Sequence, residues 1–233
     1  MNTTAKFYGI GVGPGDPELM TLKSINYIKD SICIILPAKD KESCHAYQIA
    51  AEVVPEIDRK ELLFCPFPMT MKKNELIEFH NQVAEMVMDK LNVGKSVAFL
   101  TIGDPTLYST YSYIREIVVN AGYEIDIVSG INSFSAVAAR LGISLGDGSE
   151  QIHIIPGSAN FDSTMELSGT RIYMKSGKKL AELIERLRIQ MDTKPLKIYS
   201  VSNCGMDSET VAYSIDEINT ESGYLTIVIV KEA

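Results

Sequence analysis

A glycine-rich turn near the amino terminus is the first feature of this sequence that could do chemistry. The stretch from Gly9 to Pro17 carries four glycines at alternate positions, between an apolar run and a segment expected to be helical from about Glu18. Glycine adopts φ values closed to other residues and lets a ligand approach the backbone closely. A helix amino terminus adds free N–H groups and a positive dipole end. The turn predicts a nearby ligand, although a purely structural strand-to-helix turn would have the same pattern.

The common nucleotide fingerprints do not describe this turn. A G-x-G-x-x-G dinucleotide loop needs glycine where the chain has Pro14 or Asp16. A Walker A loop needs a Gly-Lys-Ser/Thr sequence, which does not follow. A nicotinamide-dependent dehydrogenase is therefore disfavoured.

A second turn, Leu100 to Ser109, follows another apolar run. Gly103 would bare the backbone at the carboxyl end of a strand, where open α/β sheets place ligands. Asp104 suits a helix N-cap and Pro105 the first helical position. Capping alone could also explain this Asp-Pro pair.

Two further turns have weaker patterns. In Ser129 to Ala136, Ser133 can cap a helix of small residues that runs to Arg140. Close helix packing would explain these small residues as well as a flat ligand would. Ser202 to Glu209 contains Gly205 and could be an ordinary loop.

Nothing in the sequence indicates a metal site or a nucleophilic triad. The histidines lie far apart, and so do the cysteines, which form no CxxC pair; they are His45, His80, His153, Cys33, Cys44, Cys65 and Cys204. His80 lies on an apolar helix stripe and is interpreted as a core residue. No protein-bound metal is expected.

Short Ile/Val-rich runs alternate with amphipathic segments and must position these turns. Strands are expected at 7–12, 31–36, 96–102, 123–128, 151–155, 171–174, 196–201 and 224–230. Helices are expected at 74–91, 106–121 and 178–191, where apolar residues recur with helical period. Alternation of this kind predicts an α/β fold. So many strands favour two α/β domains, 1–120 and 121–233, over one small sheet.

Composition narrows the class of protein. The chain has 233 residues, 45% hydrophobic and 22% charged, with a net charge of −8. These values exclude a largely disordered chain and disfavour nucleic-acid binding, which needs a basic face. No apolar run approaches the roughly 20 residues that span a bilayer, and Met1 to Lys6 contain no apolar leader. A cytoplasmic protein without a membrane partner is expected.

Taken together, three motifs resemble the tetrapyrrole methylase family. They are Gly11-x-Gly13-Pro14-Gly15-Asp16-Pro17, Gly103-Asp104-Pro105-x-x-Tyr108-Ser109 and Gly130-Ile131-x-Ser133, and their order and spacing cover most of the chain. Ser129 departs from the family, which usually has proline there. The stretches 103–111, 139–143 and 204–207 are most similar to the branch that methylates C20 of precorrin-2 or its cobalt form.

This resemblance implies a homodimer with two α/β domains per chain, and S-adenosylmethionine as methyl donor in a cleft between the domains. It also implies roles for individual residues. The donor site would use Pro14, Ile102, Gly103, Asp104, Leu107, Ser133, Met174 and Gly205. The tetrapyrrole would meet Gly11, Gly13, Asp16 and Lys39. Asp104, Tyr108 or Lys175 would assist loss of the C20 proton after transfer.

Several alternatives stay open at this point. The same fold could methylate another ring carbon, such as C11 or C17, or a protein substrate, as in diphthine synthesis. A non-catalytic nucleotide-binding module is a further possibility. A tetrapyrrole carries many carboxylates, so an acidic protein needs local cations, for which the candidates are Lys39, Lys41, Arg115, Arg140, Lys175 and Lys178.

Overall fold

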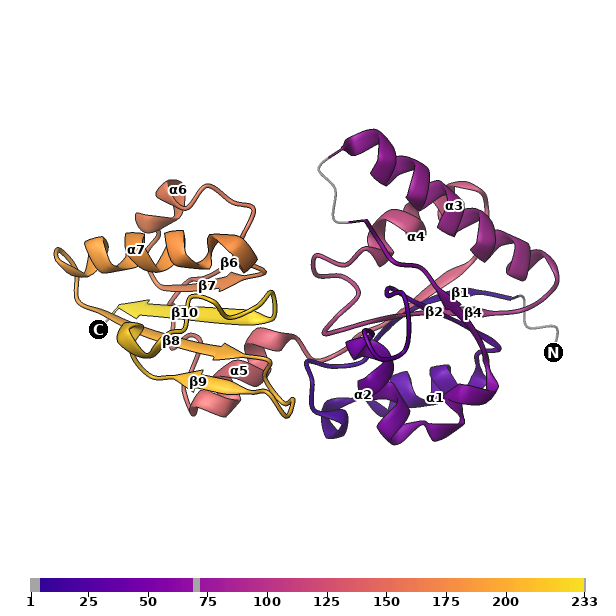
Figure 1. Cartoon of the computed structure of the whole chain (residues 1–233), viewed down its shortest axis with the longest axis horizontal. Helices are drawn as coiled ribbons and strands as arrows, with labels where there is room; N and C mark the ends of the chain where they lie inside the picture. The colour runs from indigo at the N-terminus through magenta and orange to yellow at the C-terminus, as the bar shows by residue number, and fades with distance from the viewer. Residues whose placement is uncertain (1–4, 69–71, 233) are drawn as a thin grey trace. The chain divides into compact units, whose positions relative to one another are not determined.

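The computed structural model of the chain describes residues 5–68 and 72–232. It divides into two compact units, Met1–Asn132 and Ser133–Ala233. Each unit has its own five-stranded sheet with helices packed on it (Figure 1). The predicted α/β fold is confirmed. Residues 1–4, which include most of the segment examined for a leader, lie outside the described residues.

All strands of the first sheet are parallel, in the order β3-β2-β4-β1-β5. Their bounds are β1 Phe7–Gly11, β2 Cys33–Leu36, β3 Glu61–Phe64, β4 Val97–Thr101 and β5 Ile125–Val128. β1 lies between β4 and β5, with Phe7 opposite both Val97 and Ile125. Because the strands are parallel, the turns that follow β1, β4 and β5 emerge at the same edge of the sheet.

Helices cover both faces of this sheet. They are α1 Leu22–Asp30, α2 His45–Val53, α3 Lys73–Asn92 and α4 Tyr111–Asn120, with 3-10 helices η1 Pro17–Leu19 and η2 Pro55–Arg59. In Figure 1, α3 and α4 lie on one face and α1 and α2 on the other. Every residue of β2 is buried, as expected of a strand covered on both faces. Phe7, Ile35 and Phe99 point into the core beneath α3 and α4.

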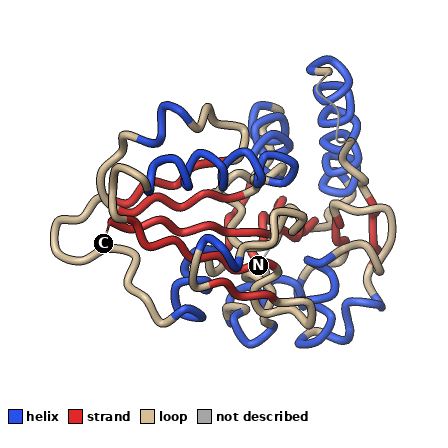
Figure 2. Tube along the Cα trace, turned by 60° about the vertical axis from the view of Figure 1, so that its left-hand side comes forward, coloured by secondary structure: helices blue, strands red, loops and turns tan. Residues whose placement is uncertain are grey.

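The second sheet is mixed, in the order β6-β7-β10-β8-β9. Only β6 and β7 pair in parallel. Figure 2 shows its strands running beneath a long helix. The elements are α5 Ser133–Leu141, β6 Ile152–Pro156, α6 Asp162–Met165, β7 Thr170–Met174, η3 Gly177–Lys179, α7 Leu180–Met191, β8 Leu196–Ser202, β9 Thr210–Ala212, η4 Ile215–Glu217 and β10 Thr226–Glu232.

The predicted apolar stripe of α7 forms the core of this second unit. Leu180, Leu183, Ile184 and Leu187 are buried against β7, β8 and β10, whereas Met191 at the helix end is 39% exposed. α5 contacts β8 and β10 and lies on the face opposite α7 in Figure 1.

Two expectations differ from the structure. The helix expected from Thr106 begins only at Tyr111, because residues 104–110 form turns that the Asp104 side chain holds. The division between units follows Asn132, later than the expected boundary at 120/121, because β5 pairs with β1 and so belongs to the first sheet. The edge strands β3 and β9 and helix α2 were not expected at all.

Candidate functional site

The three glycine turns of the first unit meet at the carboxyl edge of its sheet. Gly11 ends β1 opposite Thr101 of β4. The Val12 N–H donates to the Thr101 carbonyl at 2.9 Å, and the Gly103 N–H donates to the Gly13 carbonyl at 2.7 Å. The turns after β1 and β4 are thus joined backbone to backbone, as their predicted places at strand ends imply.

Glycine is required where these turns pack together. A Cβ on Gly130 would lie 2.0 Å from the Gly103 carbonyl oxygen and 2.9 Å from the Gly11 Cα. A Cβ on Gly11 would lie 2.4 Å from the same oxygen. These contacts are with backbone, which cannot rotate away. We call Gly11, Gly103 and Gly130 the glycine node.

Gly103 is the member of the glycine node that leaves space. Its φ is +72°, and within the described residues a Cβ there would approach only the Ile131 carbonyl oxygen, at 3.9 Å. Half-buried Ile102 and Leu107 flank it. An open backbone beside apolar side chains suits a ligand with a flat or apolar portion and a few polar atoms.

The Asp104 carboxylate accepts hydrogen bonds from two of these turns through its two oxygens. One oxygen, Oδ1, accepts the Thr106 N–H at 2.7 Å and the Thr106 hydroxyl. The other, Oδ2, accepts the Gly130 N–H at 3.1 Å. The side chain is buried, with 7% exposure. Asp104 therefore ties the turn after β4 to the turn after β5.

Among the described residues, three non-glycine residues have left-handed backbone, one in the first unit and two in the second, and each lies in a segment that follows a strand. They are Tyr108 at φ +49°, Lys175 at +58° and Asn203 at +52°. Such conformations are costly for residues with a side chain and are concentrated at functional sites. Two of the three, Tyr108 and Lys175, are predicted catalytic residues.

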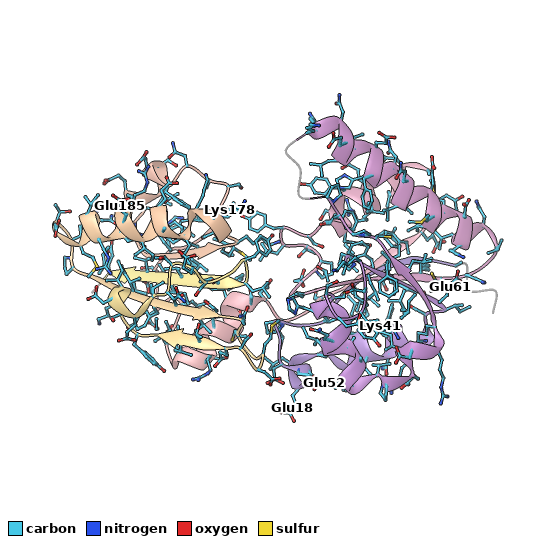
Figure 3. All side chains as sticks on the ribbon, in the orientation of Figure 1. Glu18, Lys41, Glu52, Glu61, Lys178 and Glu185 are labelled. Atoms are coloured by element: carbon cyan, nitrogen blue, oxygen red, sulfur yellow. The ribbon has the colours of Figure 1, made fainter. Side chains whose placement is uncertain are left out.

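In the second unit, the ends of β6 and β7 are in close contact. Gly157 donates its N–H to the carbonyl of buried Met174 at 2.7 Å, and a Cβ on Gly157 would lie 2.4 Å from the Lys175 carbonyl oxygen. The Lys175 ammonium lies 5.6 Å from the centre of the Tyr224 ring. Burial lowers the pKa of Lys175 below its ordinary 10.5. Lys178, in η3, is exposed nearby in the chain (Figure 3).

The remaining predicted residues lie on several different elements. Pro14 is buried in the first turn, and Ser133 begins α5. Asp16 accepts the Glu18 N–H at 2.8 Å, so it caps η1. Lys39 follows β2 and has a 75% exposed side chain, 3.7 Å from Asp40.

Besides Lys39, which lies beside Asp40, two more of the candidate cations have carboxylate partners. Lys41 contacts Asp58 at 2.5 Å, and Arg140 contacts Glu209 at 2.6 Å. Their positive charges are therefore partly neutralised by carboxylates of the protein itself. This weakens the expectation that they bind substrate carboxylates.

Sequence reasoning missed several residues of the site. Gly157 and Tyr224 lie at strand ends without a motif, and Glu209 was only the last residue of a loop. The contacts of Gly157 and Tyr224 with Lys175, and of Glu209 with Arg140, join segments far apart in the chain. Only the order of the strands in the second sheet brings them together.

The sequence that builds these turns is similar to a known protein family. A family model described as "Tetrapyrrole (Corrin/Porphyrin) Methylases" matches residues 6–219. The chain belongs to the tetrapyrrole methylase family. The motifs that suggested the resemblance are the ones that build the glycine node.

Relatives of known name cover nearly the whole of this tetrapyrrole methylase. It is 36% identical to the "Probable cobalt-precorrin-2 C(20)-methyltransferase" of Methanocaldococcus jannaschii, over 97% of this chain and 96% of that one. It is 26% identical to the "Precorrin-2 C(20)-methyltransferase" of a Sinorhizobium species, over 97% and 94% of the two chains.

Solved structures of other tetrapyrrole methylases share the fold. A cobalt precorrin-4 methyltransferase superposes with a TM-score of 0.78 at 17% identity, covering 99% of this chain and 96% of that one. A uroporphyrin-III C-methyltransferase from Thermus thermophilus, solved with S-adenyl homocysteine, gives 0.67 at 16% identity, covering 98% of both chains. At such identities these likenesses concern the fold only.

No helix within residues 5–68 and 72–232 has the length and apolar character needed to cross a membrane. In the same part of the chain, no three His, Cys, Asp or Glu side chains gather as a possible metal site.

Proposed function

We propose that this protein transfers a methyl group from S-adenosylmethionine to C20 of cobalt-precorrin-2 or precorrin-2 in cobalamin biosynthesis. The observation that carries the proposal is the 36% identity, over nearly the full length of both chains, to a relative named for C20 methylation of cobalt-precorrin-2. The relative named for metal-free precorrin-2 is less similar, at 26%. We therefore favour the cobalt-containing substrate.

The residues of the first unit fit the proposed methyl donor. Open backbone at Gly103, with half-buried Ile102 and Leu107 beside it, suits a nucleoside that presents both an apolar ring and polar edges. In the second unit, Met174 and Gly205 lie at the ends of β7 and β8. We propose these residues, with Pro14, Asp104 and Ser133, as the donor site. Gly11, Gly13, Asp16 and Lys39 are proposed for the tetrapyrrole.

The main task of the protein's residues in this reaction is to position the methyl donor and the tetrapyrrole relative to each other. The donor supplies a methyl group already activated on a sulfonium, and the meso carbon of a reduced tetrapyrrole is nucleophilic. The chain must hold the two reactants in line and exclude water. The turns of the glycine node are packed backbone against backbone, which favours a fixed platform for this alignment.

Lys175 is the residue we propose as acceptor of the proton that leaves C20. Burial lowers its pKa, which increases the fraction of neutral amine able to accept a proton. Asp104 is less suited, because both of its oxygens already accept hydrogen bonds from Thr106 and Gly130. We propose Asp104 as a positioning residue, and Tyr108 as a second candidate beside Lys175.

The experiment that tests the proposed function uses the purified protein with S-adenosylmethionine. Cobalt-loaded and metal-free dimethylated tetrapyrrole are supplied in parallel reactions, and products are analysed by mass spectrometry and NMR. We expect one added methyl, located at C20, with faster turnover of the cobalt form. No methyl gain with either substrate, despite measurable donor binding, would rule out C20 methylation.

Methylation of C11 is a second candidate function. One relative, 26% identical over 62% of this chain, is named "Cobalt-precorrin-4 C(11)-methyltransferase". Its lower identity and coverage make this reaction less well supported. A methyl located at C11 in the same NMR experiment would favour it.

We also propose that the enzyme is a cytoplasmic homodimer without a resident metal. The family resemblance supports the dimer. Light scattering measures the mass directly, because one chain has a mass of 25.7 kDa and a dimer twice that value. Metal analysis of the purified protein tests the last point.

A further inference from the structure

The loop after β8 is held closed by a carboxylate within the loop itself. The Glu209 Oε2 accepts the Gly205 N–H at 2.9 Å. The other oxygen, Oε1, accepts the Arg140 Nε–H at 2.6 Å, from the last turn of α5. One side chain thus bonds the tip of the loop and fastens it to a helix far away in the sequence.

The backbone of this loop is left-handed at two positions, of which only Asn203 carries a side chain that makes this conformation costly. Asn203 has φ +52° and Gly205 has φ +78°. Inside the loop, Met206 N–H donates to the Asn203 carbonyl at 3.0 Å, and Glu209 N–H donates to the Met206 carbonyl at 2.9 Å. These bonds close the turn, and the Glu209 side chain connects it to α5 through a charged contact with Arg140.

Burial and charge indicate that Glu209 is the central group of this arrangement. Its side chain is 18% exposed, against 49% for Arg140. Burial alone would raise the pKa of Glu209, but the bonds from Gly205 and Arg140 outweigh it and the pKa is lowered. The carboxylate is therefore ionised at neutral pH and accepts both donors.

Two of the three stretches that are most similar to the C20 branch are joined by this contact. Arg140 lies in 139–143, and Gly205 lies in 204–207. These segments are far apart in the chain, and the second unit places them within hydrogen-bonding distance through Glu209.

We propose that Glu209 is a positioning residue for methyl-donor binding, acting through Gly205, with Arg140 as its anchor. This rests on the proposed function, in which Gly205 belongs to the donor site. When an amide replaces the carboxylate, one acceptor oxygen is left for two donors, the Gly205 N–H and Arg140, so the loop is held less firmly. The donor site is then formed in only a fraction of molecules, which weakens apparent donor affinity.

The test compares Glu209→Gln with a matched control, Glu217→Gln. Glu217 makes the same kind of contact in the same unit, because its Oε2 accepts the Tyr213 N–H, four residues earlier, at 2.9 Å. It lies outside the Gly205 loop. Isothermal titration with S-adenosylhomocysteine measures Kd, steady-state kinetics measure KM for each substrate, and hydrogen exchange reports on the Gly205 amide.

For Glu209→Gln we expect about a tenfold rise in Kd and in donor KM. The tetrapyrrole KM should stay unchanged, and amide exchange should be faster at Gly205 but not in the core strands. Arg140→Met should give a smaller effect in the same direction, and Arg140→Lys should restore most of the affinity. Glu217→Gln should match the wild type.

The proposal is overturned if Glu209→Gln binds S-adenosylhomocysteine as the wild type does, or if it only lowers overall stability. It is also overturned if the wild type does not bind S-adenosylhomocysteine. Failure of the proposed function is a distinct result, because a wild type that binds S-adenosylhomocysteine but does not methylate either tetrapyrrole still allows the Kd comparison.

Discussion

At the scale of single residues, the members of the glycine node matter because glycine has no side chain. Gly130 has no room for a Cβ, because the Gly103 carbonyl oxygen would lie 2.0 Å away. Gly103, by contrast, has open space on its Cβ side. Gly130 lets the three turns pack together, and Gly103 leaves space beside them for a ligand.

Gly130→Ala should destabilise the protein by about 1–3 kcal/mol, the usual range for overpacking against atoms that cannot move. Activity should fall as well, since the shift displaces the turn that contains Gly103. Urea unfolding gives the free energy. Gly223→Ala is the control, because no atom lies within 4 Å of its added Cβ; an equal loss in both variants would contradict the packing argument.

Asp104→Asn should lower the free energy of unfolding by about 1–3 kcal/mol, because it weakens charge-assisted bonds to Thr106 and Gly130. The affinity for S-adenosylhomocysteine should fall in parallel. Urea unfolding and titration calorimetry measure the two quantities. A variant with wild-type stability and binding but no turnover would instead identify Asp104 as a catalytic base.

Lys175→Met should reduce kcat by about 10²–10⁴-fold with little change in donor KM, as for loss of a general base. The wild-type rate should rise with pH through the pKa of Lys175, since the amine must be neutral and burial holds that pKa below 10.5. The variant should lose this rise. Lys194→Met, whose exposed side chain lies 3.9 Å from Glu166, is the control; an unaltered pH–rate profile in Lys175→Met would exclude the role.

At the scale of elements, an ion pair between β10 and the start of β6 stabilises the second unit. Lys231 on β10 contacts the Glu150 carboxylate at 3.0 Å, the Thr170 hydroxyl at 3.1 Å and the Leu145 carbonyl at 3.3 Å. Both charged side chains are largely buried, at 16% and 22% exposure. The contact fastens the connection between α5 and β6 to the central strand of the sheet.

Glu150→Gln should reduce stability at neutral pH by about 1–3 kcal/mol. Bonds from Lys231 and Thr170 lower the pKa of Glu150 below its ordinary 4.5. Its contribution is therefore present above pH 4.5 and is lost as pH falls through the folded-state pKa. Thermal melting at several pH values should show the wild type and variant converging in acid. Glu166→Gln is the control. The Glu166 side chain is 86% exposed and lies 3.9 Å from Lys194, so its replacement should have little effect on stability at any pH.

At the scale of the whole molecule, an acidic protein is proposed to bind a polyanionic substrate. The net charge is −8, so local cations must attract the carboxylates against the overall field. Lys41 and Arg140 are already paired with Asp58 and Glu209. Lys39, on the turn after β2, also lies beside Asp40, but at the longer distance of 3.7 Å and with a 75% exposed side chain, so it is the best candidate of the first unit.

The KM for the tetrapyrrole should rise several-fold as NaCl increases from about 0.05 M to about 0.5 M, because salt screens exposed charges. Lys39→Gln should raise KM at low salt and flatten this dependence. Lys197→Gln, an exposed lysine on β8, should leave both unchanged. A tetrapyrrole KM that does not respond to salt would contradict steering by surface lysines.

The sequence by itself determined the fold class, most strands and the family. Short Ile/Val-rich runs and the apolar stripe of α7 are local patterns. A continuous apolar run predicts a strand buried on both faces, and an apolar stripe predicts a helix buried on one face. The strand-end turns were also identifiable, because glycine and proline restrict the backbone wherever they stand. The edge strands β3 and β9 were missed because short, half-exposed segments carry little pattern.

Only the tertiary structure decided which turns touch and what each polar side chain does. Parallel pairing of β1 with β4 and β5 brings Gly11, Gly103 and Gly130 together and moves the boundary between units to Asn132. Asp104 has the pattern of a helix cap, yet its second oxygen bonds Gly130, 26 residues away. Contacts such as this one and Arg140–Glu209 depend on strand order, which no local run of residues encodes.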